Sequence, residues 1–414
     1  MLSHGLEYLA IPGPSVIPNR VLQAMHQPSP NIYTGHLGDV IETVKKDLNT
    51  IAGSSGDVAL YASNGHGVWE AALANIVMPG EAVLFLATGQ FALHWAVLAR
   101  SLGIDAKIIT FGNRDTIDLD KVQEVLNQDS RGKIKAICVP HVDTATSVIN
   151  DIKALRQAMT ELNHPALLCV DIIASLGSDR FEMDNWGVDV AVAACQKGLM
   201  TPAGLSFLFF GQKGAAARAQ LNHVSAYWDW NIRASTDQIY ASFFGTPPTQ
   251  HLFGLRTALD MILYEEGLET VLQRHKVLAQ TIWAALDAWK HPEGLRMTLP
   301  NFDIRSHAVT SIEAGPQNGA RLQNWTRQNV GLTLGCGLGM AGDSDPECRD
   351  YFRIGHMGHV NGHMIMGALG AIDAGLKALD IPHAKGALDA AASVIAKATK
   401  HSDFAEHSKY HVHL

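Results

Sequence analysis

Residues 166–210 read ALLCVDIIASLGSDRFEMDNWGVDVAVAACQKGLMTPAGLSFLFF. Apolar runs cover residues 166–170, 188–195 and 205–210, each bounded by Gly, Pro or polar residues. Continuous apolar runs of this length predict strands buried on both faces, as in a parallel or mixed sheet under helices. Asp171 stands where the first run ends, and Lys197 follows the second.

A lysine and an aspartate at strand ends suit one kind of chemistry. The lysine amine can form a Schiff base with an aldehyde cofactor. The aspartate can keep a pyridine nitrogen protonated, so that the ring withdraws electrons. Taken alone, such a pair is more often a surface lysine and a loop aspartate, so the surrounding sequence has to decide.

Alternating apolar runs and helical patterns extend around this stretch. Strand patterns cover residues 58–61, 82–87, 106–110 and 134–140, and helical patterns cover 40–52, 91–102, 119–127 and 152–162. This alternation predicts a doubly wound, mostly parallel α/β domain. Long helical patterns follow at 251–266 and 268–289, and from about residue 290 the pattern is that of a smaller α+β unit with strands at 308–312 and 330–334.

The domain organisation follows from these patterns. Residues 1–20 contain several prolines, which predict an extended N-terminal arm. We expect a large domain over 21–266 and a small C-terminal domain over 267–400, with the boundary at Glu265-Glu266-Gly267. We expect the histidine-rich tail, 401–414, to be solvated and to hold no metal, because its histidines have no fixed spacing.

Composition excludes several function classes. The net charge of −8 argues against a nucleic-acid-binding surface. No apolar run reaches membrane-spanning length, and the N-terminus lacks a signal peptide's basic start and apolar core. The five cysteines are an odd number, and three lie in apolar runs, which predicts buried free thiols in a reducing compartment. We therefore expect a cytoplasmic protein.

The turn Asn64-Gly65-His66-Gly67 lies between a strand pattern and a helical pattern. Small residues at such a turn leave backbone N–H groups free, and the helix dipole favours an anion there. The turn is therefore a weak signal for a phosphate-binding site.

Longer matches carry a resemblance to a known family. The chain has His164-Pro-Ala-Leu-Leu, Asp184-Asn-Trp-Gly-Val-Asp, Cys195-Gln-Lys-Gly-Leu-Met-Thr-Pro-Ala-Gly and Phe352-Arg-Ile-Gly-His-Met-Gly. In these motifs it resembles the class V aminotransferases of fold type I, which depend on pyridoxal 5'-phosphate (PLP), and above all the serine–glyoxylate and alanine–glyoxylate enzymes. The resemblance runs from residue 11 to about residue 390.

The resemblance implies roles for individual residues. Lys197 would carry the cofactor and Asp171 would pair with its ring nitrogen. Arg353 would bind the substrate's α-carboxylate, a task that suits the planar guanidinium. Gly13, in the arm that crosses the active-site mouth, would also touch substrate. The other implied cofactor-binding residues are Asn64, Gly65 and His66 at the phosphate, Phe91 stacked on the ring, Thr144 beside it, Gln196, and Thr246 at the phosphate of a neighbouring subunit.

The implied function is transfer of an amino group from serine, alanine or aspartate to glyoxylate or pyruvate by a ping-pong mechanism, in a homodimer with shared active sites. Two segments depart from the family pattern. Phe244-Gly245 replaces a Pro-Tyr pair, and Pro28-Ser29-Pro30 stands where glyoxylate enzymes have His-Arg-Ser. Both departures bear on the donor pocket.

Other functions stay open at this point. A related transaminase could act on an unusual amine such as pyridoxamine or ureidoglycine. A cysteine desulfurase-like lyase would need a mobile nucleophilic cysteine, and Cys336, in a Gly-rich segment expected to be a flexible loop, is the candidate. A non-enzymatic protein of this fold would bind the ligand only as a sensor.

Overall fold

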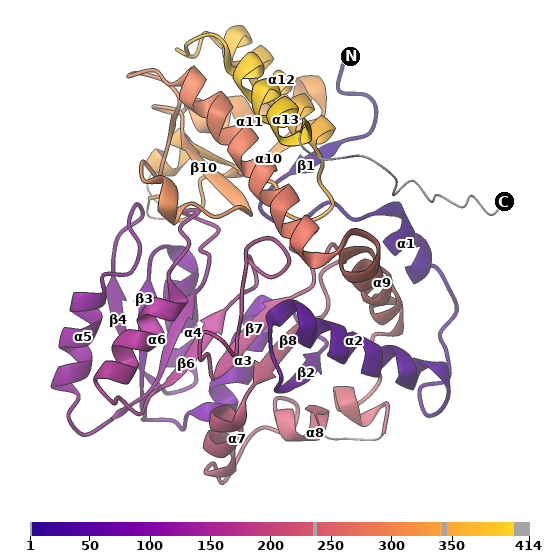
Figure 1. Cartoon of the computed structure of the whole chain (residues 1–414), viewed down its shortest axis with the longest axis vertical. Helices are drawn as coiled ribbons and strands as arrows, with labels where there is room; N and C mark the ends of the chain where they lie inside the picture. Colours follow the sequence, from indigo (N-terminus) through magenta and orange to yellow (C-terminus); the bar gives the residue numbers. More distant parts are fainter. Residues whose placement is uncertain (1, 235–237, 342–345, 401–414) are drawn as a thin grey trace.

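The computed structural model describes residues 2–234, 238–341 and 346–400, so the expectation for the tail 401–414 lies outside the described residues (Figure 1). The larger part of the molecule is built around a mostly parallel sheet of seven strands. Its strands, in spatial order, are β2 (Asp57–Tyr61), β8 (Ser206–Phe210), β7 (Val190–Ala194), β6 (Leu167–Asp171), β5 (Ile134–Pro140), β3 (Ala82–Ala87) and β4 (Asp105–Thr110).

Strand directions agree with the predicted doubly wound domain. Strand β8 runs antiparallel to β2 and β7, whereas the pairs β7–β6, β6–β5, β5–β3 and β3–β4 are parallel. The expected mostly parallel α/β sheet is confirmed. Because parallel strands end at the same edge, the residues that follow β3, β5, β6 and β7 meet there.

Helices cover both faces of this sheet, which is why its inner strands β3, β6, β7 and β8 are buried throughout and read as apolar runs. Within β6, Leu168 and Val170 pack into one core layer, and Leu167 and Cys169 into the other. The first layer includes residues of α2 (His36–Ala52), α5 (Leu119–Gln128), α6 (Ile152–Glu161) and α9 (Thr249–Asp260). The second includes residues of α3 (Gly65–Ile76), α4 (Gln90–Ser101), α7 (Gln212–Ala219) and α8 (Trp230–Ala234).

A smaller sheet lies with the C-terminal helices at one end of the molecule (Figure 1). Its strands, in spatial order, are β1 (Tyr8–Ala10), β11 (Leu332–Cys336), β12 (Tyr351–Gly355), β10 (Val309–Glu313) and β9 (Arg296–Met297). Its own core includes residues of α10 (Leu268–Trp289), α11 (Asn318–Val330), α12 (Gly362–Ala378) and α13 (Ala387–Thr399). We propose that the two sheets mark the two expected domains, around 21–266 and 267–400.

The N-terminal segment is more than an extended arm. Strand β1 pairs in parallel with β11 and so adds an edge strand to the small sheet. Residues 11–18 then cross to the large domain, where α1 (Asn19–Met25) packs near α9. The chain therefore passes between the two sheets twice, and the crossing segment includes Gly13.

One predicted boundary is wrong, and one predicted helix contains an irregular turn. The strand expected at 330–334 begins at Leu332, because Val330 ends α11, a helix that the sequence patterns did not predict. The helix expected over 251–266 is confirmed in its end: α9 ends at Asp260, and a π-helical turn, Met261–Glu266, continues it directly. Three short 3-10 turns complete the list: Ala241–Phe243, Phe302–Ile304 and Pro346–Asp350.

Two further features bear on the sequence analysis: the apolar character of the helices and the state of the cysteines. Within the described ranges, no helix is long and apolar enough to cross a membrane. All five cysteines are free thiols, and Cys138, Cys169 and Cys195 are buried, as predicted.

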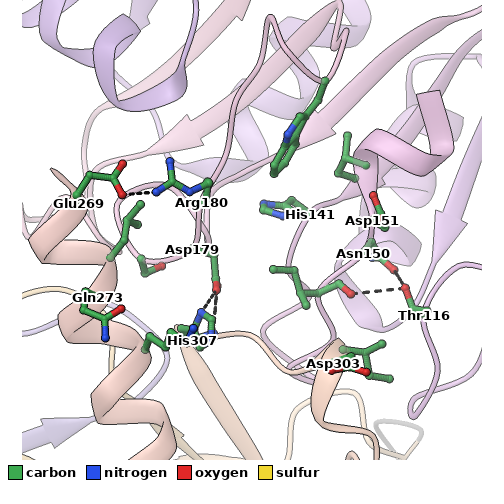
Figure 2. Close-up of a pocket in the computed structure, with 17 residues that line it drawn as sticks. Thr116, His141, Asn150, Asp151, Asp179, Arg180, Glu269, Gln273, Asp303 and His307 are labelled. Carbon is green, nitrogen blue, oxygen red and sulfur yellow. Dashed lines mark hydrogen bonds and ion pairs between the residues drawn. The ribbon is translucent and has the colours of Figure 1, made fainter. Parts of the chain in front are cut away.

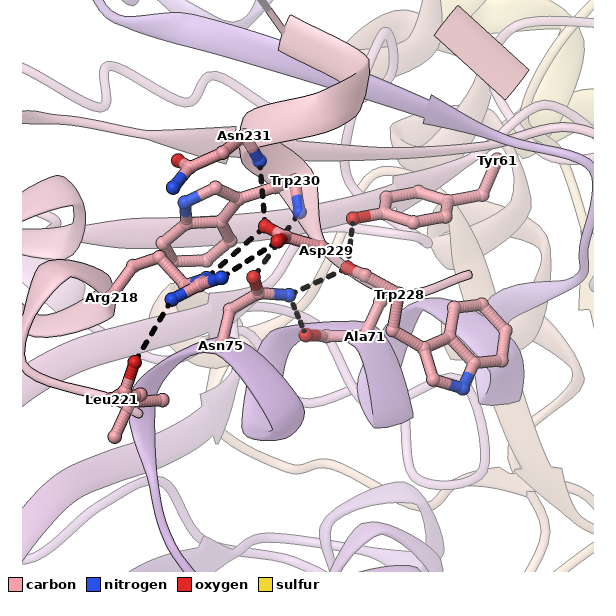
Figure 3. Close-up of polar contacts among 9 residues, drawn as sticks. All are labelled: Tyr61, Ala71, Asn75, Arg218, Leu221, Trp228, Asp229, Trp230 and Asn231. Atoms are coloured by element: carbon pink, nitrogen blue, oxygen red, sulfur yellow. Dashed lines mark hydrogen bonds and ion pairs between the residues drawn. The ribbon is translucent and has the colours of Figure 1, made fainter. Parts of the chain in front are cut away.

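A buried amide joins α3 to the segment before α8 (Figure 3). The side-chain nitrogen of Asn75 donates to the carbonyls of Ala71 and Trp228, both at 2.7 Å, and its oxygen accepts from the backbone N–H of Trp230. Asn75 and Trp230 are fully buried, so water cannot replace the hydrogen bond between them. The contacts hold α3, whose first turn faces the site described below, against the rest of the domain.

Replacing Asn75 by alanine is expected to lower the free energy of unfolding by about 2–3 kcal/mol, because the buried N–H of Trp230 loses its acceptor. Urea titration followed by circular dichroism measures this change. The matched control is Asn329→Ala, which removes an exposed amide bonded to the carbonyl of Trp325. Equal losses in the two variants would contradict the structural role of Asn75.

Candidate active site

A cavity of about 300 Å³ opens at the carboxyl edge of the large sheet. Residues that follow β5, β6 and β7 meet there with the first turn of α3 and the N-terminal crossing segment, as strand direction predicts. We call it the central pocket. It is lined by Gly13, Pro14, Asn64, Gly65, His66, Trp69, Phe91, Val142, Thr144, Asp171, Ile173, Ala174, Gln196, Lys197 and Ala203.

Lys197 projects into the central pocket from the turn after β7. Its amine donates to the carbonyl of Pro12, and a Cβ built on Gly13 would lie 2.6 Å from its Nζ. The absence of a side chain at position 13 leaves room for the amine in this position, and the φ of +116° also favours glycine there. Burial, together with the charge of Arg353, lowers the pKa of Lys197 to about 8. An amine with a lowered pKa is free to act as a nucleophile or base near neutral pH.

Asp171 is the last residue of β6, and its carboxylate is buried in the central pocket. Its Oδ1 accepts from the backbone N–H of Ile173 at 2.7 Å, and its Oδ2 accepts from the indole Nε1–H of Trp69 at 2.9 Å. Burial raises the pKa of Asp171 to about 7, although both hydrogen bonds and Lys197 act in the opposite direction. A cation beside this carboxylate would therefore hold it ionised.

Trp69 is a site residue that sequence reasoning missed. Its ring stacks on Trp95 at 5.6 Å between centroids, and this fixes the indole N–H toward Asp171. Trp69 lies five residues after Asn64, on the inner face of α3. An apolar helix face reads as core, so only its position one turn after the predicted phosphate turn could have pointed to it.

The first turn of α3 faces the central pocket, as the phosphate prediction requires. Asn64 is the N-cap, and its side chain accepts from the N–H of Gly67. The N–H groups of Gly65 and His66 belong to the first turn of a helix, where no carbonyl of the same helix can accept from them. Three of the lining residues thus form the positive end of a twelve-residue helix, which suits a phosphate.

Three further predicted residues line the same pocket: Phe91, Thr144 and Gln196. Phe91 lies in the first turn of α4, with its ring edge-on to that of Trp69. The side-chain Oε1 of Gln196 is buried and has no hydrogen-bond partner. A buried orphan acceptor in a cavity calls for a ligand that donates to it or a water that does.

Together these features fit PLP. A helix N-terminus suits its phosphate, an aromatic ring its heterocycle, a carboxylate its ring nitrogen and a lysine amine its aldehyde. The sequence prediction placed these groups along 134 residues, from Asn64 to Lys197, and the fold brings them to one cavity.

Arg353 lies on β12, beside the central pocket. Its Nη1–H donates to the carbonyl of Thr144 at 2.7 Å, and its Nε–H donates to the carbonyl of Cys336 at 2.6 Å. The guanidinium is buried and close enough to lower the pKa of Lys197. The arginine of the small sheet is therefore held at the pocket by a contact to the large domain.

Thr246 lies apart from the central pocket within one chain. It is exposed, in the segment between the turn Ala241–Phe243 and α9, and it is not among the lining residues. Its predicted role concerns a neighbouring subunit and stays a prediction. Phe244 and Gly245, where the family pattern is broken, are exposed in the same segment.

The expectation that Cys336 lies in a flexible loop is wrong. It is the last residue of β11 and pairs with Phe352 of β12. Its carbonyl accepts from Arg353, and its sulfur lies 3.9 Å from the Nη2 of the same residue. The Gly-rich composition misled because glycines there allow close strand contacts: a Cβ on Gly335 would lie 2.6 Å from Pro12.

A separate cavity of about 650 Å³ lies between the loops after β5 and β6 and the helix α10 (Figure 2). Its lining includes His141, Asp179, Arg180 and His307, and the Nδ1 of His307 lies 2.8 Å from the carboxylate of Asp179. Within the described part of the chain, this cavity is lined by none of the residues that the sequence analysis assigned to cofactor or substrate. The larger of these two cavities is therefore not the one that the predicted site residues line.

Known proteins share this chain's sequence and fold. A family model described as aminotransferase class V matches residues 7–332. A serine–glyoxylate aminotransferase of Arabidopsis thaliana is 33% identical over 95% of this chain and 96% of the relative. An L-aspartate–glyoxylate aminotransferase of Paracoccus denitrificans is 32% identical over 90% of this chain and 91% of the relative.

A solved structure agrees in fold. The ureidoglycine–glyoxylate aminotransferase of Bacillus subtilis has a TM-score of 0.84 at 23% identity, covering 95% of this chain and 98% of that one. This likeness confirms the predicted fold, that of the fold-type I transferases. The family match spans most of the chain, and both relatives are more than 30% identical over nearly their whole length. The chain therefore belongs to the class V aminotransferases.

Proposed function

We propose that this protein is a PLP-dependent transaminase that moves the amino group of a small amino acid to glyoxylate. One observation carries the proposal: Lys197 and Asp171 line a single pocket at the carboxyl edge of the sheet, opposite the free N–H groups of α3. An amine, a carboxylate and an anion-binding helix end are the groups that this cofactor needs.

The acceptor is proposed from the relatives. The three proteins compared above differ in the named amino donor, which is serine, aspartate or ureidoglycine, but all three are named for glyoxylate. Glyoxylate is therefore the first acceptor to test, with pyruvate second. Serine, alanine and aspartate are the first donors to test.

The residues of this chain divide the chemistry among them. PLP, when bound, supplies the electron sink that makes the α-proton of an amino acid acidic. The Nζ of Lys197, with a pKa of about 8, can take that proton from the α-carbon. Arg353 binds the α-carboxylate and thereby orients the Cα–H bond toward this amine. Phe91 and Trp69 exclude water from one side of the pocket.

Assembly and location belong to the same proposal. The protein acts as a cytoplasmic homodimer in which Thr246, exposed on one chain, contributes to the neighbour's phosphate site. Tyr240 and Phe244 lie close to Thr246 in sequence, and both are exposed. The ring of Tyr33, also exposed, packs edge-on to that of Tyr240 at 5.7 Å between centroids. Exposed aromatic groups of this kind favour an interface.

Glycine production tests the proposed function. Purified protein with PLP is incubated with glyoxylate and, separately, L-serine, L-alanine or L-aspartate, and glycine is measured by chromatography. We expect one donor to give a kcat/KM at least tenfold above the others. If none of the three donors yields glycine above a protein-free control, the proposal for these substrates fails.

The other functions have distinct signatures. An unusual-amine transaminase would convert glyoxylate to glycine, or pyruvate to alanine, when pyridoxamine or ureidoglycine is the amino donor. It would not do so with serine, alanine or aspartate as the donor. A desulfurase would release alanine from cysteine, a reaction disfavoured here because Cys336 is fixed at the end of a strand. A ligand-binding protein without activity would take up PLP and transfer nothing.

A further inference from the structure

Asp143 is a buried carboxylate that the proposed chemistry does not use. It follows β5, next to the pocket residues Val142 and Thr144, and its side chain is fully buried. Its Oδ2 accepts from the backbone N–H of Phe91 at 2.9 Å, and its Oδ1 accepts from that of Ala145 at 2.9 Å. One side chain thus joins the start of α4 to the loop after β5.

The first turn of α4 depends on this carboxylate. The N-cap of α4 is Gly89, which has no side chain to accept from the helix N–H groups. Asp143 accepts from the second helical residue, Phe91, and so caps the helix from another part of the chain. Because Phe91 lines the central pocket, the cap also fixes where its ring can lie.

Gly89 and Asp143 are matched to each other. A Cβ built on Gly89 would lie 2.5 Å from the Oδ1 of Asp143. The backbone of Gly89 is extended, with φ at 171°, a conformation that any residue can adopt. Glycine is therefore required at this position to admit the carboxylate, and not by its own backbone.

The charge of Asp143 also acts on the groups in the pocket. It opposes the burial that lowers the pKa of Lys197, and it adds to the burial that raises the pKa of Asp171. Burial raises the pKa of Asp143 itself, while its backbone hydrogen bonds and the charge of Arg353 act in the opposite direction. The carboxylates of Asp143 and Asp171 thus balance the positive charges of Lys197 and Arg353, and the side chains of Asp143, Asp171 and Arg353 are buried.

We propose that Asp143 is a positioning residue of the active site, which caps α4 to hold the ring of Phe91 at the cofactor and supplies a buried negative charge next to the pocket that contains Lys197. The inference rests on the proposed PLP function. By this proposal, the loop after β5 helps to position the cofactor and helps to set the pH range of the reaction.

The first test is the pH dependence of PLP capture by the apo protein, followed as the growth of visible absorbance from pH 6 to 10. The free amine captures PLP, so the native rate should rise with a midpoint near the Lys197 pKa of about 8. In Asp143→Asn the negative charge is gone, and the midpoint should fall by about one pH unit. Asp143→Glu keeps the charge and should keep the native midpoint.

The second test moves the carboxylate without changing it. Gly89→Ala adds a methyl group against Asp143, so the cap should break and the cofactor should dissociate roughly tenfold faster. Gly370→Ala in α12 adds a methyl group where nothing lies within 4 Å and should retain PLP like the native protein. Retention is measured by dialysis of the loaded protein, and this test stands even if Asp143→Asn does not fold.

The outcomes distinguish a failure of the role given to Asp143 from a failure of the proposed function. An unchanged midpoint in Asp143→Asn, or native retention in Gly89→Ala, overturns the role of Asp143 while leaving the proposed function intact. Capture of PLP by Lys197→Ala at the native rate and pH profile would instead overturn the proposed function. A lowered midpoint in Asp143→Asn together with a native midpoint in Asp143→Glu supports the role of the Asp143 charge. Loss of fold alone cannot produce this pair of results.

Discussion

Replacing Lys197 by alanine is expected to lower the turnover number for transamination by about 10⁴-fold or more, because the variant loses both the attachment of the cofactor and the proton-transferring amine. No other lysine lines the central pocket among the described residues. The expected result is a protein that still folds but forms no glycine above background, measured with glyoxylate and the best donor.

The control for Lys197→Ala is Lys46→Ala. Lys46 is exposed on α2, and we expect its replacement to leave activity within twofold of the native value. Circular dichroism and the unfolding midpoint of both variants show whether the fold is kept. A Lys197→Ala protein that transaminated at an ordinary rate would refute the assignment of the lysine.

Replacing Arg353 by lysine is expected to raise the KM for the amino donor and for the keto acid by roughly 100-fold each, because an ammonium cannot make the paired hydrogen bonds of a guanidinium with a carboxylate. Both substrates carry the carboxylate, so both constants should rise. Cofactor capture should persist, since Lys197 and the α3 turn are untouched. Steady-state kinetics with each substrate varied in turn measure the effect.

The matched control for Arg353→Lys is Arg327→Lys, an exposed position on α11. It should leave both KM values unchanged. If Arg353→Lys changed kcat alone, the arginine would act on the chemical step and not on carboxylate binding. That outcome would contradict the role given to Arg353.

Much of the large domain could be predicted from the sequence, because its inner strands are buried on both faces. The run at 166–170 corresponds to β6, which ends at Asp171, and the run at 205–210 to β8. Strands of this kind are continuous and apolar, and Gly, Pro or polar residues mark their ends. The site residues at those ends could therefore be placed at one edge before the structure was known.

The small domain was harder to predict, because its elements depend on contacts distant in sequence. Strand β1 forms only by pairing with β11, more than 320 residues away, and nothing local in residues 8–10 specifies that partner. Helix α11 carries many polar residues on a largely exposed face, which weakens its apolar periodicity. Local patterns do not report such pairings.

Side-chain partners within the site were also beyond sequence reasoning. Trp69 reads as an apolar helix residue, and its bond to Asp171 depends on how α3 crosses the sheet. Asp143 reads as a loop aspartate, and its partner Phe91 lies 52 residues earlier. A resemblance to a family names the residues that touch cofactor, whereas the residues that position them emerge from the packing.

The visible spectrum of the purified protein, loaded with PLP and then mixed with L-serine, L-alanine or L-aspartate separately, tests the central claim most directly. We predict an absorbance band of lysine-bound cofactor that one of these amino acids bleaches and that glyoxylate then restores. A PLP-loaded protein without such a band, or with a band that Lys197→Ala retains, would contradict the account.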